Sequence, residues 1–238
     1  MEKIITLKRI SDFDKYIHFD SFLIESVFSS FSQFVFNKED ILFILNKCHE
    51  FNKKLYLKAD KILIESEIDS LNSYKQIFSL VDGLFFEDLS FITYFKKENI
   101  NTELIYFPFD SLGDDFDLET LFEYGVSRIC VPHGKNYLLN SKHLNKLGYK
   151  SIYREVLFYT RRKLLSLYNE VNGLSILDKK YSMQEKTRTS TQSIVETPVG
   201  TLILSSIEQV DFNKDISFIV YDSSFIDDEE FDNLLEKE

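Results

Sequence analysis

The sequence predicts an α/β fold: a (β/α)8 TIM-like barrel with a helix-plus-hairpin insertion between its seventh and eighth strands. Short apolar runs rich in β-branched and aromatic residues recur along the chain, helix-like segments separate them, and eight such runs can be counted. With 238 residues and 44% hydrophobic content, the chain is long enough to form one barrel domain over residues 1–238.

The elements follow from local patterns. The expected strands lie near residues 4–7, 22–25, 55–59, 83–87, 103–107, 128–131, 151–158 and 216–221. The expected helices cover residues 11–17, 38–51, 64–80, 89–99, 117–124 and 141–147. In the second helix Asn37 is a suitable N-cap, and Ile41, Ile44, Leu45 and Cys48 share one face. The 23 Phe residues and the absence of Trp predict that Phe fills many core positions.

The alternation breaks over residues 159–212. We expect a helix over 161–169, a polar stretch over 178–193 and a hairpin over 194–205 that turns at 198–200. An insertion between two barrel strands lies at a rim, where loops carry function. The acids at 227–230 predict a terminal amphipathic helix, to which we assign no chemistry.

Charge is segregated. Residues 142–188 contain eleven Lys or Arg and four acids, which gives this window a formal charge of +7. Because the net charge of the whole chain is −11, the remaining residues sum to −18. The segment 159–168 concentrates cations and aromatic rings, as expected of a site for a phosphate-bearing ligand. The alternative is a solvated face that docks on an acidic neighbour.

Composition also bounds the compartment. Cys48 and Cys130 lie far apart without a CxxC spacing, and Cys130 stands in an apolar run that predicts a buried, unreactive thiol. The apolar stretch at the N-terminus is too short, and too soon interrupted by charge, for a signal peptide. No apolar run approaches the ~18 residues of a membrane span. We therefore expect a cytoplasmic protein without membrane contact.

The insertion carries a family resemblance. Residues 161–170 (RRKLLSLYNE), 183–188 (MQEKTR), 194–196 (IVE) and 200–205 (GTLILS) follow in an order that resembles the collagenase-like peptidase family U-32. The segments 81–88 and 122–129 also look like barrel units of that family, so the resemblance extends over about residues 1–221. Within the family, the chain most resembles the short, single-barrel type associated with tRNA 5-hydroxyuridine formation.

The resemblance implies a TIM-like barrel and a part in RNA modification. Relatives hydroxylate RNA bases, including the wobble uridine of tRNA, or serve ubiquinone hydroxylation, and proteolysis is claimed for a few. The family's strand-seven His-Gly pair and the cysteine after it fall where this chain reads SIYREVLF at 151–158, and its strand-six Arg-Glu pair appears here as Pro132-His133. Several relatives bind an iron–sulfur cluster through four cysteines, and with two cysteines no such cluster is expected here.

The candidate residues follow from charge and position. Arg161, Arg162, Lys163, Tyr168, Lys186 and Arg188 are the substrate-binding candidates. On a helix the first three cannot all face one way, and Tyr168 either stacks on a base or packs. His133, Glu185 and Glu196 are weaker catalytic candidates, the two glutamates being equally suited to ion pairs. No metal set is legible, and the small-molecule cofactor stays unknown.

Three functions remain open from the sequence. The first is RNA modification, with tRNA wobble uridine 5-hydroxylation as its form and residues 154–188 holding the substrate. The second is a non-catalytic scaffold, a possible pseudoenzyme that binds a second, complete U-32 subunit. The third is proteolysis of collagen-like substrates, although no Ser-His-Asp, Cys-His or HExxH arrangement is present.

Overall fold

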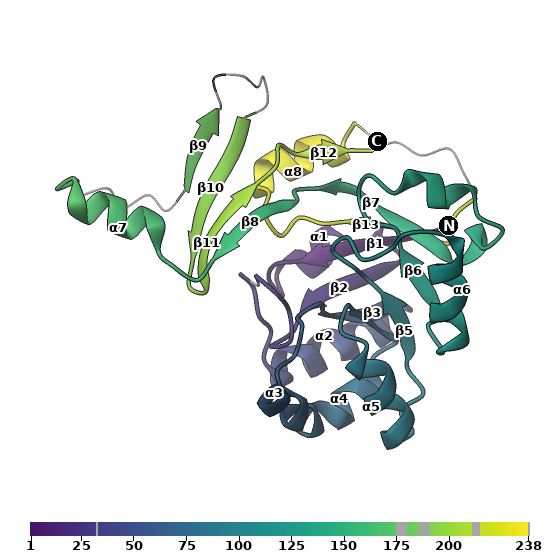
Figure 1. The fold of residues 1–238 in the computed structure, drawn as a ribbon. Helices are drawn as coiled ribbons and strands as arrows, with labels where there is room; N and C mark the ends of the chain where they lie inside the picture. The colour runs from purple at the N-terminus through teal and green to yellow at the C-terminus, as the bar shows by residue number, and fades with distance from the viewer. Residues whose placement is uncertain (32, 175–179, 185, 187–190, 211–214, 238) are drawn as a thin grey trace. The chain divides into compact units, whose positions relative to one another are not determined.

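The computed structural model describes residues 1–31, 33–174, 180–184, 186, 191–210 and 215–237 (Figure 1). The chain divides into two compact units. The first comprises Met1–Ser151 and Asp211–Tyr221, and the second comprises Ile152–Val210 and Asp222–Glu238.

The first unit contains the expected barrel. Eight parallel strands close on themselves in the order β7-β13-β1-β2-β3-β4-β5-β6, with β6 paired to β7. Their bounds are β1 Glu2–Leu7, β2 Ser21–Glu25, β3 Lys54–Ala59, β4 Gly83–Phe86, β5 Glu103–Tyr106, β6 Arg128–Cys130, β7 Leu147–Tyr153 and β13 Phe218–Tyr221. The (β/α)8 TIM-like fold predicted from the sequence is thus confirmed.

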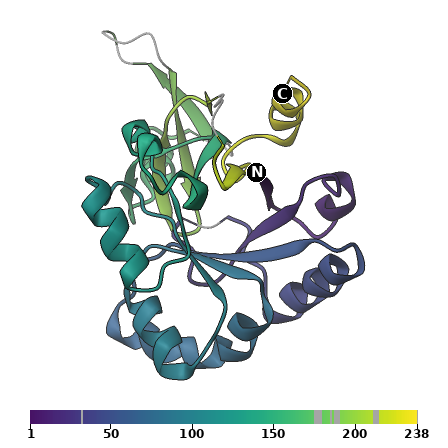
Figure 2. The same ribbon diagram turned by 90° about the vertical axis from the view of Figure 1, so that its right-hand side faces the viewer.

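Helices connect the strands on the outside of the barrel (Figures 1 and 2). They are α1 Asp12–Lys15, α2 Lys38–Glu50, α3 Glu65–Ser70, α4 Lys75–Leu80, α5 Ser90–Glu98 and α6 Asp115–Glu123, with 3-10 turns at Leu71–Tyr74, Asn136–Asn140 and Leu144–Lys146. Asn37 caps α2 as predicted, because its side chain accepts a hydrogen bond from the Asp40 N–H at 2.8 Å. The predicted apolar face of α2 is buried.

Three of the elements predicted outside residues 159–212 are wrong in their bounds. The helix expected over 64–80 is interrupted by the 3-10 turn at Leu71–Tyr74, where the Ser70 and Ser73 hydroxyls donate to the backbone carbonyls of Glu67 and Ser70. The helix expected over 141–147 is a 3-10 turn that runs directly into β7. The strand expected over 151–158 is divided, because β7 ends at Tyr153 and a strand of a different sheet begins at Val156.

Phenylalanine fills the barrel interior, as the composition predicts. The Phe85 ring lies 5.5 Å from the rings of Tyr56 and Phe107 and 5.8 Å from that of Phe218, in edge-on contacts. Gly148 leaves room for this packing, since a Cβ there would meet the Phe218 carbonyl oxygen at 2.5 Å and its ring at 2.6 Å.

A polar network stands at the amino ends of the strands. The Arg128 guanidinium donates to both carboxylate oxygens of Glu103, at 2.7 and 2.6 Å, to Glu2 at 2.6 Å and to the Tyr56 hydroxyl at 2.8 Å. It also lies 4.8 Å from the centre of the Phe218 ring. At this end of a barrel, such contacts serve stability.

The second unit contains a four-stranded antiparallel sheet in the order β8-β11-β10-β9. Its strands are β8 Val156–Thr160, β9 Lys180–Gln184, β10 Thr191–Thr197 and β11 Gly200–Leu204; the unit also holds α7 Leu164–Val171, the short strand β12 Glu208–Gln209 and the terminal helix α8 Asp228–Leu235. The hairpin predicted over 194–205 is β10 and β11, and the acid-started terminal helix is α8, so both predictions are confirmed. β9 lies in the stretch for which only polar character was expected.

Candidate functional site

The carboxyl ends of β2 and β3 bring a buried lysine between two carboxylates. Lys58 and Glu25 are 6% and 1% exposed. The Lys58 Nζ lies 3.7 Å from Glu25 Oε1 and 3.5 Å from Asp60 Oδ2. Buried charges persist when they are paired in this way, and the carboxyl end is where barrel enzymes carry their chemistry.

The loop after β2 is tied to these charges. Glu25 Oε2 accepts hydrogen bonds from the Gln33 and Phe34 N–H groups at 3.0 Å each. The Ser30 N–H donates to Asp60 Oδ1 at 2.7 Å. The cluster therefore orders the loop that follows β2, and its carboxylates already have donors.

Glu87, directly after β4, has a raised pKa. Burial raises the pKa of Glu87, the hydrogen bond from the Phe109 N–H at 3.0 Å opposes that rise, and the charges of Asp60 and Asp88 add to it. A half-buried carboxyl group in this state is suited to donate or accept a proton. The sequence signal for this cluster was available, since acids follow three consecutive strands, but only the closed barrel brings them together.

His133 lies just beyond the end of β6 and is exposed. It precedes Gly134, whose φ of 78° turns the chain. The catalytic role of His133 stays a prediction, because its position after β6 does not test it.

In the second unit, the structure places Arg161, Arg162 and Lys163 before α7 rather than on it. The helix predicted over 161–169 is wrong at its start, because α7 begins at Leu164. The Thr201 hydroxyl accepts a hydrogen bond from the Leu164 N–H at 2.9 Å and donates to the Arg162 carbonyl at 2.8 Å. These bonds fix the backbone of residues 161–163, while their three side chains are exposed. In the described part of the chain, no ion pair uses any of the three.

Gly200 makes this turn possible. A Cβ there would meet the Thr160 carbonyl oxygen at 2.1 Å and the Arg161 Cα at 2.9 Å. The glycine of the family-like segment 200–205 therefore permits the close approach that presents the three cations.

Glu196 and Tyr168 belong to the same neighbourhood. Glu196, 5% exposed in β10, accepts a 2.9 Å hydrogen bond from the Ser166 N–H, and its other oxygen accepts from the Ser166 hydroxyl. A carboxylate at the first turn of a helix stabilises that helix. Tyr168 is 59% exposed, so its ring is available to a ligand.

The remaining predicted residues are less informative. Lys186 is exposed, whereas Glu185 and Arg188 lie outside the described residues. Arg154, which begins the segment 154–188, is engaged within its own unit. It donates to the Ser193 hydroxyl at 2.9 Å and to the Ser205 carbonyl at 3.1 Å, and it lies 3.7 Å from a Glu230 oxygen.

The cysteines do not fit a cluster site. Cys130 lies in the barrel core and Cys48 on the buried face of α2, so neither the number nor the placement of thiols matches a four-cysteine ligand set. Burial, with a smaller contribution from the charge of Asp82, raises the pKa of Cys48 to about 12. Among the described residues, no group of three or more His, Cys, Asp or Glu side chains is placed to hold a metal ion. In the same residues, no helix combines the length and apolar character needed to cross a membrane.

Comparison with known proteins supports the fold. No family model matches the sequence, and no curated protein matches it. Among solved structures, the U32 peptidase Mk0906 superposes with a TM-score of 0.57 at 10% identity, over 94% of this chain and 93% of that one. The spore cortex-lytic enzyme SleL of Bacillus cereus superposes with a TM-score of 0.49 at 9% identity, over 99% and 74% of the two chains. The superposition on Mk0906 shows that the chain has a U32-peptidase-like barrel fold.

Proposed function

We propose that this chain is a U-32-type barrel protein that takes part in RNA modification, in the form of tRNA wobble uridine 5-hydroxylation. One observation carries the proposal. Three consecutive cations, Arg161, Arg162 and Lys163, are exposed on a turn whose backbone is held in place by Thr201.

The chemistry of this turn suits RNA. Each guanidinium presents a planar fork of donors that matches a phosphate, and Lys163 adds a third positive charge. Tyr168, one turn of helix further on and 59% exposed, offers a ring on which an unpaired base can stack. A cation pair with a neighbouring aromatic ring is the combination that single-stranded RNA sites use.

The overall charge limits the affinity. At a net charge of −11 the chain as a whole repels RNA, and phosphate neutralisation supplies most of nucleic-acid affinity. The proposal therefore includes a second subunit, of the related U-32 type, that completes the RNA surface and the chemistry.

The experiment compares two double variants in a strain that lacks the gene. Arg161→Ala/Arg162→Ala removes two cations from the proposed site, and Lys96→Ala/Lys97→Ala removes two exposed cations from α5. We expect wobble 5-hydroxyuridine, measured by mass spectrometry of tRNA, to be lost with the first and retained with the second. Equal modification in both strains would contradict a role for the basic turn.

A second candidate function is a non-catalytic subunit that binds a protein partner. It is favoured by the outward face of α7, where Leu167, Tyr168 and Val171 are 53%, 59% and 76% exposed. Under this alternative, Leu167→Ser/Val171→Ser loses a co-purified partner, whereas Arg161→Ala/Arg162→Ala leaves tRNA modification unchanged.

A further inference from the structure

The helix α7 presents its apolar side to solvent. Leu164, Leu167, Tyr168 and Val171 are 39%, 53%, 59% and 76% exposed, and their i, i+3, i+4, i+7 spacing places them on one face. Asn169, by contrast, is buried at 8%. A helix that buries an asparagine and exposes four apolar side chains has a face suited to a partner.

Cations adjoin this apolar face. Arg161, Arg162 and Lys163 lead directly into Leu164, so positive charge lies at one end of the exposed row. We call the three cations and the four apolar residues of the preceding paragraph the α7 surface. Its formal charge is +3. A phosphate group would pair with the cations but would leave the four apolar side chains exposed to water, so this surface fits a partner that is itself partly apolar.

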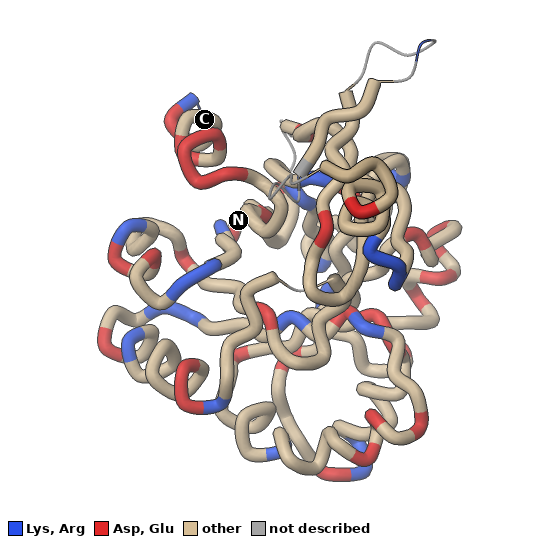
Figure 3. Tube along the Cα trace, turned by 90° about the vertical axis from the view of Figure 1, so that its left-hand side faces the viewer, with Lys and Arg blue, Asp and Glu red and all other residues tan. Residues whose placement is uncertain are grey.

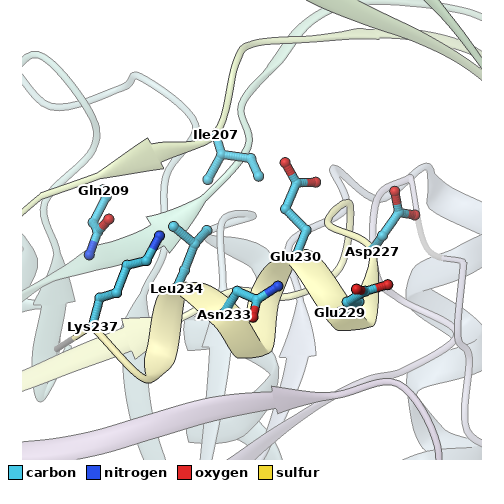
Figure 4. A pocket seen from close by; sticks show the side chains of 8 residues that line it. All are labelled: Ile207, Gln209, Asp227, Glu229, Glu230, Asn233, Leu234 and Lys237. Carbon is cyan, nitrogen blue, oxygen red and sulfur yellow. The ribbon is translucent and has the colours of Figure 1, made fainter.

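A groove of opposite character lies elsewhere in the same unit, between α8 and the segment that leads into β12. Its volume is about 560 Å³. Figure 4 shows Ile207 and Leu234 facing each other across it. This apolar floor is large enough to receive a few side chains of a helix.

Acids dominate the rim of this groove, which we call the α8 groove. Asp227, Glu229 and Glu230 stand at one end and Lys237 at the other (Figure 4), for a formal charge of −2. The run of acids at the start of α8 is visible along the chain in Figure 3. Glu229 is exposed, and the side chain of Glu230 is 48% exposed although it lies 3.7 Å from Arg154.

We infer that the α7 surface of one copy of this chain binds the α8 groove of a second copy. Charge complementarity carries the inference: a +3 surface and a −2 groove, each with an apolar centre, occur on the same chain. Because the two surfaces differ, the contact is head-to-tail and leaves one free surface of each kind at the ends of an open assembly.

This association goes beyond the proposed RNA function and competes with it. Arg161 and Arg162 face either the acids of the α8 groove or the phosphates of RNA, so RNA and a second copy exclude each other at this surface. The α8 groove itself is not part of the RNA site, and this separates the two proposals experimentally.

Sedimentation measurements on three variants test the inference. Arg161→Glu/Arg162→Glu reverses the charge of the α7 surface, and Gln209→Lys/Glu229→Lys makes the α8 groove positive. Gln76→Lys/Glu123→Lys adds the same charge as the groove variant at exposed positions of α4 and α6, and serves as the control. We expect the unaltered chain and the control to exceed the monomer mass of 28.1 kDa increasingly as concentration rises. Each of the first two variants should remain at the monomer mass.

Mixing the two non-associating variants gives the sharpest result. The first keeps an intact α8 groove and the second keeps an intact α7 surface, so together they form one contact and stop at twice the monomer mass. The inference is overturned if the unaltered chain stays monomeric, if either variant associates alone, or if the mixture stays monomeric. Leu167→Ser examines the same surface without a charge change and should also weaken association, which covers a folding defect in the first variant. RNA binding by the groove variant should be intact, so loss of self-association there leaves the RNA proposal standing.

Discussion

Replacing Arg128 by Ala removes the centre of the polar network at the amino ends of the strands. The side chain is 10% exposed and makes four hydrogen bonds, to Glu103, Glu2 and Tyr56. Removing one partner of a buried pair costs about 3–5 kcal/mol, mainly because the other charge stays buried. Glu103 is 28% exposed and can regain water, whereas Glu2 is 14% exposed. We therefore expect a loss near the lower limit, about 3 kcal/mol in the free energy of unfolding at about pH 7.

Acid should narrow the difference between this variant and the unaltered chain. Burial acts to raise the pKa of Glu2, but the charge of Arg128 and the hydrogen bonds from Ser21, Arg128 and Tyr56 together more than offset it, so the pKa lies below its ordinary value of 4.5. A carboxyl group with a lowered pKa stabilises the fold above that ordinary value, and the stabilisation is lost as pH falls through the lowered pKa. The Arg128 contribution should therefore shrink below pH 4.5.

Chemical denaturation, followed by circular dichroism at several pH values, measures both effects. Lys75→Ala is the control, since it breaks the exposed Lys75–Glu98 pair of 2.7 Å and should therefore lower the free energy of unfolding much less than Arg128→Ala does. The reasoning is refuted if Arg128→Ala costs no more than Lys75→Ala, or if its cost does not change with pH.

Three further outcomes follow from single contacts. Glu87→Gln should raise the free energy of unfolding at about pH 7 by less than about 1 kcal/mol, because a carboxyl with a raised pKa destabilises the fold when ionised; the gain should vanish by about pH 4 in the same denaturation assay. Gly148→Ala should lower the free energy of unfolding by about 1–3 kcal/mol, since its Cβ would overlap Phe218, and an unchanged midpoint would contradict this. Glu196→Ala should cost about 1–2 kcal/mol by removing the acceptor for Ser166, and hydrogen exchange should quicken in α7 while the barrel amides keep their protection.

The barrel could be predicted because its strands are short runs of β-branched and aromatic residues that stand out in the sequence. Each of the eight expected strands overlaps a barrel strand, although the one expected over 151–158 also covers the start of β8. Helix α2 shows both its cap and its buried face in the sequence. The failures have local causes. At Ser70 and Ser73, hydroxyl groups compete for backbone carbonyls and divide a helix.

The insertion was harder to predict because tertiary contacts decide its elements. The start of α7 is set by Thr201, a residue far along the chain, whose hydroxyl receives the Leu164 N–H. The polar segment β9 forms a strand because it pairs with β10. The local amino-acid composition does not indicate such a pairing.

Of the two candidate sites, one could be predicted from the sequence and the other could not. The basic turn was visible as a charge anomaly, although its cations lie before the helix rather than on it. The Lys58 cluster was missed because the sequence shows only a single lysine within an otherwise apolar strand. The structure shows that Glu25 and Asp60 lie close enough to pair with it. Sequence shows such charges singly, and the closed sheet shows them as a group.

The amount of wobble 5-hydroxyuridine in tRNA from a strain without this gene tests the proposed function most directly. We expect the modification to disappear and to return when the unaltered chain is supplied. Unchanged modification in the deletion strain would contradict a role in this reaction.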